Sequence, residues 1–144
     1  MQAEATAILS SADCSGGVSE ADVKRAEQRL GVEFPLELRE FLKDFGAATG
    51  VGLDIAGVRK GDDASPPLWR DMVAETERLR KVTQNKLPHS LVLISDDGCG
   101  VKFYVDTVSN KTDCRVVAYG PNFDGIVVAD SLSDFIVKRV NEDI

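Results

Sequence analysis

The sequence predicts an α+β fold in which an antiparallel sheet of about four to six strands is covered on one side by helices. Apolar residues recur at helical spacing between residues 18 and 46, which indicates an N-terminal helical pair. In the second half the apolar residues instead form continuous or alternating runs separated by turn residues, as in a strand meander. A last helical pattern after residue 131 closes the chain.

The first predicted helix has local signals at both ends. Ser19 is its expected N-cap, and Asp22 at the third helical position completes a weaker form of the capping box. Val18 and Val23 stand where a hydrophobic staple would fix the chain entering the helix. Gly31 follows the last apolar position as the expected C-terminal stop.

A second helix is expected to start at Pro35, because proline has no N–H to lose in the first helical turn. Its buried stripe repeats at i, i+3, i+4 and i+7 until Gly46, with Leu38, Phe41, Leu42 and Phe45 facing inward. Neither of these helices carries a nucleophile beside a base or a phosphate loop, so both are interpreted as scaffold.

The flanking segments give weaker patterns. Residues 1–17 are predicted to be a less ordered, irregular or weakly helical lead-in, and residues 53–58 a short strand. Residues 59–67 form a polar loop rich in breaker residues. A third helix is predicted over 68–82, with an inward stripe of Leu68, Met72, Leu79 and Val82.

The second half contains the strands. Residues 91–94 are continuously apolar, as in a strand covered on both faces, whereas 101–106 alternate and predict one inward face. Further strands are expected at 115–119 and 126–129, joined by a loop over 120–125. Ser131 and Asp134 form an S-x-x-D cap for the closing helix, whose apolar stripe is Leu132, Phe135, Ile136 and Val140. We expect one domain over residues 1–144.

Composition limits the partners. The formal charge is −7 and the sequence pI about 4.7, which disfavours general binding to nucleic acid or anionic membrane and favours either solubility or a basic protein partner. The chain carries no signal-peptide pattern and no apolar run of membrane-spanning length. Three cysteines at unrelated spacings, Cys14, Cys99 and Cys114, are expected to be reduced thiols, although a bridge between the latter two is geometrically conceivable. We therefore expect a cytoplasmic protein, monomeric or weakly dimeric.

No pattern in the sequence predicts catalysis or a cofactor. His89 is the only histidine, and a nucleophilic Cys99 would need it as a base together with an orienting third group that the sequence does not supply. Asp96, Asp97 and Asp124 could gather round a hard cation, but Asp-Asp-Gly between two strands is first of all turn chemistry. The glycines form neither a dinucleotide-binding nor a P-loop motif. We expect a binding protein rather than an enzyme.

Trp69 is the one tryptophan, and two interpretations of it stay open. A large aromatic at a helix start contributes apolar area to a core. Beside the acidic loop that contains Asp62 and Asp63, it could instead be an anchor at a protein interface.

Several motifs in order resemble the SUKH superfamily, the Smi/Knr-like proteins named after a yeast cell-wall assembly regulator. The N-terminal part matches as Val18-Ser19-Glu20, then Glu27-x-x-Leu30-Gly31-Val32-x-Phe34-Pro35-x-x-Leu38-x-x-Phe41-Leu42. The middle matches as Leu87-Pro88 before 91–94 and as Asp97-Gly98-x-Gly100 before Phe103-Tyr104-Val105-Asp106. The end matches as Val128-Ala129-Asp130-Ser131-Leu132-x-x-Phe135-Ile136, with Leu132 where the family usually has Phe. The resemblance covers residues 18–140.

The resemblance implies an α+β fold and no catalytic residues. It further implies a bacterial immunity protein that binds and neutralises a cognate secreted toxin, often a nuclease, delivered by contact-dependent or type VI secretion. An acidic inhibitor could occlude the basic cleft of such a toxin. The candidate partner-binding residues are Asp62, Asp63, Trp69, Asp96, Asp97 and Asp124. The alternatives are a cytoplasmic adaptor or regulator without a toxin partner and a small hydrolase that uses Cys99 or the carboxylates.

Overall fold

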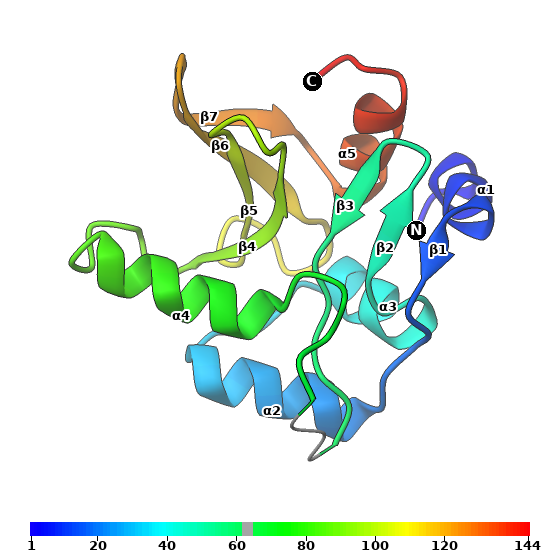
Figure 1. Cartoon of the computed structure of the whole chain (residues 1–144), viewed down its shortest axis with the longest axis horizontal. Coiled ribbons are helices and arrows are strands. Elements are labelled where there is room, and N and C mark those ends of the chain that lie inside the picture. The colour runs from blue at the N-terminus through cyan, green and yellow to red at the C-terminus, as the bar shows by residue number, and fades with distance from the viewer. Residues whose placement is uncertain (62–64) are drawn as a thin grey trace.

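The structure is a computed structural model that describes residues 1–61 and 65–144 (Figure 1). The helices are α1 (Ala3–Ser11), α2 (Glu20–Leu30), α3 (Leu36–Asp44), α4 (Met72–Val82) and α5 (Leu132–Val140). The strands are β1 (Asp13–Cys14), β2 (Ala48–Gly50), β3 (Leu53–Ile55), β4 (Leu91–Asp96), β5 (Lys102–Asp106), β6 (Arg115–Gly120) and β7 (Phe123–Ala129). The α+β class predicted from the sequence is confirmed.

The described strands form one antiparallel sheet in sequence order, β1 to β7, so β1 and β7 are its two edges. The sheet has seven strands, against the expected four to six. The additional strands β1 and β2 are only two and three residues long, too short to give a periodic apolar pattern in the sequence.

Helix α2 forms as its local signals predict. The Asp22 backbone N–H donates to Ser19 Oγ at 3.2 Å, and the Ser19 N–H donates to Asp22 Oδ2 at 3.1 Å, which completes the capping box. Gly31 ends the helix in the left-handed conformation with φ +68°. Pro35 differs slightly from the prediction, because it is the N-cap of α3 rather than its first helical residue.

A buried carboxylate joins α3 to the far end of the chain. Glu37 Oε1 accepts from the Leu132 N–H at 2.6 Å and the Cys114 N–H at 3.2 Å. Its Oε2 accepts from the N–H and the Oγ of Ser133, at 3.1 and 2.8 Å. The side chain therefore satisfies backbone donors at the start of α5 and just before β6, where an unsatisfied buried N–H would be costly.

The main core lies on one face of the sheet, where α1, α2, α3 and α5 pack against alternate strand residues such as Val92, Phe103 and Val116. Helix α4 reaches the opposite face as well, and its Leu79 packs with a second apolar cluster completed by Leu87, Leu91, Leu93, Tyr104 and Val117. Strand β5 therefore buries both faces, whereas its alternating pattern predicts one. Tyr104 is buried because α4 covers it. The polar hydroxyl of tyrosine makes such a position look exposed in an alternating sequence pattern.

Two segments differ from their predicted form. The lead-in contains α1, whose Ala5 and Leu9 are buried and which packs beside α5. It lacks a side-chain N-cap, so tertiary contacts hold it, among them the bond from the Gln2 N–H to Ser133 Oγ. Helix α4 begins at Met72 with Asp71 as N-cap, and Leu68, predicted to face inward, lies outside the helix and is fully exposed.

Candidate functional site

Asp96 and Asp97 shape the turn between β4 and β5. Asp96 accepts from Lys102 Nζ at 2.7 Å and from the Gly98 N–H at 2.8 Å. Burial raises the pKa of Asp96, but these two bonds outweigh it and hold the pKa below the usual value. Asp97 Oδ1 accepts from the Cys99 and Val101 N–H groups at 2.7 and 3.0 Å. Turn formation, the first interpretation of this Asp-Asp-Gly sequence, is confirmed.

Asp124 lies in strand β7, not on the predicted loop. The connection after β6 is a tight turn over residues 121 and 122, and the strand begins at Phe123. Asn122 adopts φ +67°, a conformation that asparagine tolerates and that short hairpin turns require. The exposed Asp124 therefore pairs across the sheet with Tyr119, and its row continues through Lys102 to Asp96.

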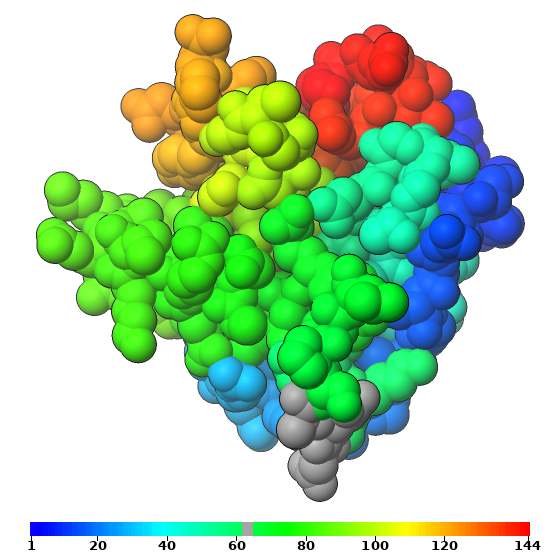
Figure 2. Space-filling model, viewed as in Figure 1, coloured from blue at the N-terminus to red at the C-terminus, as the bar shows by residue number. Residues whose placement is uncertain are grey.

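The structure brings these three aspartates to the same end of the sheet. A Cβ on Gly120 would lie 2.5 Å from the Gly100 carbonyl oxygen, so the β4–β5 turn and the β6–β7 hairpin touch backbone to backbone. Figure 2 shows the two turns side by side, in yellow-green and orange. We call this surface, residues 96–102 and 119–124, the hairpin end.

Trp69 is not part of the hairpin end. It is half-buried and lines a shallow hollow of about 190 Å³ beside β1 and β2, together with Leu68, Cys14 and Thr49. The side chain is thus neither a full core residue nor a neighbour of Asp124. Asp62 and Asp63, the other predicted contacts, lie outside the described residues.

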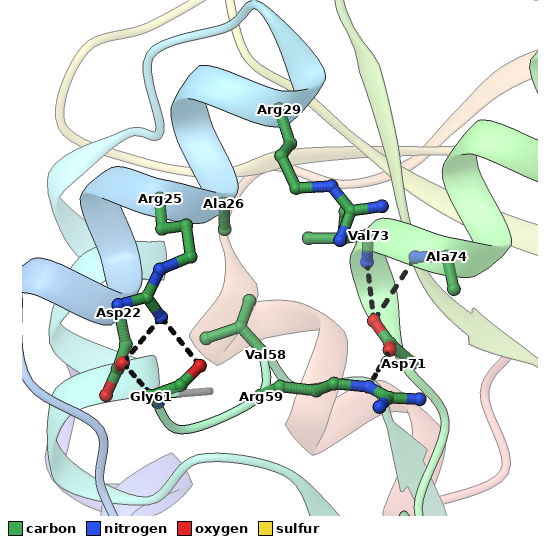
Figure 3. A pocket seen from close by; sticks show the side chains of 10 residues that line it. All are labelled: Asp22, Arg25, Ala26, Arg29, Val58, Arg59, Gly61, Asp71, Val73 and Ala74. Atoms are coloured by element: carbon green, nitrogen blue, oxygen red, sulfur yellow. Dashed lines mark hydrogen bonds and ion pairs between the residues drawn. The ribbon is translucent and has the colours of Figure 1, made fainter. Parts of the chain in front are cut away.

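A pocket of about 380 Å³ opens between α2, the segment after β3 and the start of α4 (Figure 3). Its polar lining is mostly arginine, from Arg25 and Arg29 on one face of α2 and from Arg59. No motif in the sequence predicts this site. The i, i+4 spacing of Arg25 and Arg29 was the available signal, but it does not reveal that Arg59 lies opposite them.

The arginines of this pocket are matched by carboxylates. Arg25 bonds Asp22 at 3.0 Å, Arg59 bonds Asp71 at 2.8 Å, and Arg29 bonds Glu77 at 2.5 Å. Asp71 also caps α4 by accepting from the Val73 and Ala74 N–H groups (Figure 3). The pocket is therefore interpreted as an ion-paired joint between helices.

Asp22 is the most perturbed carboxylate of that joint. Burial raises its pKa, but hydrogen bonds from the Gly61 N–H, from Ser19 and from Arg25 together lower the pKa to about 2. The Gly61 N–H lies 2.7 Å from Asp22 Oδ1, so the helix cap and the loop after β3 share one carboxylate.

The nucleophile candidates do not form a catalytic pair. His89 precedes β4 and Cys99 follows it, so the six-residue strand separates them by about 20 Å. Cys114 is buried, and burial together with the nearby Glu37 raises the pKa of its thiol.

Among residues 1–61 and 65–144, no three His, Cys, Asp or Glu side chains are grouped to hold a metal ion. No helix in this part of the chain is long and apolar enough to cross a membrane.

The family relationship of the chain extends over nearly its whole length. The SUKH_5 family, described as SMI1-KNR4 cell-wall, matches residues 3–141. The chain belongs to this SUKH family. The match includes α1, which the motif resemblance over 18–140 left out. No curated protein sequence matches the chain.

Proposed function

We propose that this protein is an immunity protein that binds a cognate secreted toxin and blocks its active site. The observation that carries the proposal is the family match over nearly the whole chain, because SUKH domains include toxin immunity proteins.

The charge of the molecule supports a basic partner. At −7 the protein attracts a basic nuclease and repels other acidic proteins, which raises association rate and specificity more than affinity. Asp124 is exposed, whereas Asp96 and Asp97 are half-buried and their carboxylates already accept hydrogen bonds within their own turn. We therefore place the electrostatic contact at the hairpin end, with Asp124 as its exposed charge.

A second function is favoured by the family's own description, which refers to the cell wall. In that case the chain is a cytoplasmic adaptor or regulator that binds a protein of its own cell. Both functions are protein binding without turnover, and they differ in whether the partner is toxic.

The test is to purify the protein encoded beside this chain's gene and measure its binding by calorimetry and its toxicity in cells. We expect a dissociation constant near the nanomolar range, about −12 kcal/mol, and rescue of toxin-expressing cells. Binding without toxicity would move the adaptor function to the front. Absence of binding to any neighbour-encoded protein would overturn the immunity proposal.

The hairpin end has its own test in the same complex. Asp124→Lys should slow association several-fold at low salt, and the difference should shrink as salt screens the charge. Asp113→Lys makes the same change in net charge at another exposed position and is the matched control. Equal association rates for the two variants would remove Asp124 from the interface.

A further inference from the structure

Strand β7 leaves one side of its backbone open. It is the last strand of the sheet, it runs for seven residues, and β6 pairs with only one of its sides. Figure 1 shows its outer side free of other elements except near α5. An open strand edge presents a row of backbone donors and acceptors that can pair with another chain.

Two features protect this edge in part. The pairing of β7 with β6 shifts register at two places, around Gly125 and Val128, and such irregularities weaken an edge as a template for pairing. Lys138 of α5 donates from Nζ to the Val128 carbonyl oxygen at 3.0 Å. Among the described residues, no side chain donates to or accepts from the backbone of residues 123–127. The backbone groups of residues 123–127 that point away from β6, about half of those in a stretch of about 17 Å, are therefore open to another strand.

The middle of β7 is apolar and exposed. Ile126 and Val127 are 50% and 46% exposed, whereas the valines of β4, β5 and β6 are buried. They are neighbours in the strand and project to opposite faces of the sheet, so together they offer apolar contact above and below an added strand. Strand β7 thus combines the hydrogen-bonding edge and the apolar side chains that strand addition uses.

The charges around this apolar middle decide what can pair with it. Asp124 and Asp130, both exposed, stand at its two ends, about 20 Å apart. A strand that lies along β7 therefore meets a carboxylate near each of its own ends. Lysine or arginine at those positions would be attracted, and aspartate or glutamate would be repelled.

The same charges disfavour a second copy of this chain. In a two-fold antiparallel pairing centred on Val127, Asp124 faces Asp130 of the second copy. In a pairing centred on Gly125, the two copies of Asp124 become diagonal neighbours. Either register brings like charges together, and the amine of Lys138 at this edge is already paired with Asp134 at 3.1 Å.

We infer that the outer edge of β7 is a docking site for an extended segment of a partner protein that has an apolar middle and a lysine or arginine near each end. The segment pairs antiparallel to β7 and extends the sheet by one strand. The inference specifies the contact used by the partner under the proposed function, and it can hold even if that partner is not a toxin.

The first test uses a synthetic strand rather than the unidentified partner. The probe is a peptide of alternating Val and Thr with Lys at both ends, methylated on the amide nitrogens of one edge so that it cannot self-assemble. We expect hydrogen-exchange protection of β7 amides and binding about fivefold or more tighter than that of the same peptide with Glu ends. Equal binding of the two peptides, or protection elsewhere than β7, overturns the inference.

A charge exchange tests the same contact from the side of the protein. The variant Asp124→Lys/Asp130→Lys should reverse the preference and bind the Glu-ended peptide more tightly. The variant Asp13→Lys/Asp113→Lys changes the net charge equally at exposed positions away from β7 and should keep the original preference. If both variants behave alike, net charge rather than the β7 edge selects the peptide, and the inference fails.

The partner of the proposed function gives an independent readout. Ile126→Lys should weaken binding of the neighbour-encoded protein at least tenfold without unfolding the chain, as checked by circular dichroism. Unchanged binding by that protein would leave the proposed function standing and overturn the docking edge. If the neighbour-encoded protein does not bind at all but the peptide still binds at β7, the docking edge stands and the proposed function is overturned.

A further outcome concerns a second copy of this chain. If the unmodified chain dimerises and Ile126→Lys abolishes the dimer, a second copy occupies the edge, contrary to the inference.

Discussion

Strand β1, at one edge of the sheet, is two residues long and begins with Asp13, whereas β7, at the other edge, is seven residues long and apolar in its middle. Short length and charge are the usual means by which proteins keep a sheet edge from pairing. Strand β1 has both, whereas β7 has charge only at its ends and two register irregularities in its pairing with β6. The contrast suggests that β7 is kept open for a partner, and each prediction below tests one part of it.

The largest loss of stability is expected at Glu37, whose carboxylate bonds the start of α5, the helix that follows β7. Glu37→Ala should lower the free energy of unfolding by about 3–5 kcal/mol, because the N–H groups of Leu132, Ser133 and Cys114 lose their acceptor in the core. Urea unfolding would measure the loss. Glu37→Gln, which keeps the size and one acceptor oxygen, should lose less. A loss below about 1 kcal/mol in the alanine variant would mean that this carboxylate does not anchor the β7 side.

The corresponding position on the β1 side is Gly46. Its φ is +82°, and an added Cβ would lie 2.2 Å from the Gly16 carbonyl oxygen and 2.5 Å from Ser15 Oγ. Gly46→Ala should therefore cost about 2–3 kcal/mol of unfolding free energy by thermal or urea denaturation. Gly98→Ala is the control, since φ is +78° there but no atom lies within 4 Å of the added Cβ. Equal losses would show that backbone strain alone, without the contact to residues 15 and 16, sets the cost.

Acid should destabilise the protein through Asp22, in the helix cap away from the β7 edge. Because folding lowers the pKa of Asp22 to about 2 from 3.8, its contribution to stability is complete above about pH 4 and is lost as the pH falls toward 2. Asp22→Asn should cost about 1–2 kcal/mol at pH 7, and this difference from the unmodified protein should vanish near pH 2. Asp124→Asn, at an exposed position, is the control and should change stability little at pH 7. A pH-independent effect of Asp22→Asn would contradict the assignment.

The smallest effect on stability is expected at the open edge itself. Ile126→Thr and Val127→Thr should each change the free energy of unfolding by less than about 0.5 kcal/mol, because both side chains are already half-exposed. Val105→Thr, at a fully buried strand position, should cost considerably more and serves as the comparison. A large loss at Ile126 would mean that this residue stabilises the fold, which removes the reason to assign it to a partner.

Local chemistry explains which parts could be predicted from the sequence. The ends of α2 depend on Ser19, Asp22 and Gly31, which act on backbone within a few residues, so the pattern alone determined them. Helix α1 has no such signal and depends on α5, more than a hundred residues away, so it was predicted only as a lead-in. The candidate site followed the same division: the turn made by Asp96 and Asp97 was predictable, whereas the position of Asp124 in β7 was not.

The sequence by itself determined the fold class, the order of most elements, the caps of α2 and α5 and the family relationship, because these depend on periodicity and on contacts between near neighbours. Only the tertiary structure decided that α4 buries Tyr104, that Glu37 bonds residues from two distant segments, and that Arg59 lies opposite Arg25 and Arg29. It alone also decided which strand is left at the edge. Sheet order and burial arise from pairings between distant segments, and an isolated apolar run such as 126–129 looks the same in a sequence whether it ends in the core or at an open edge.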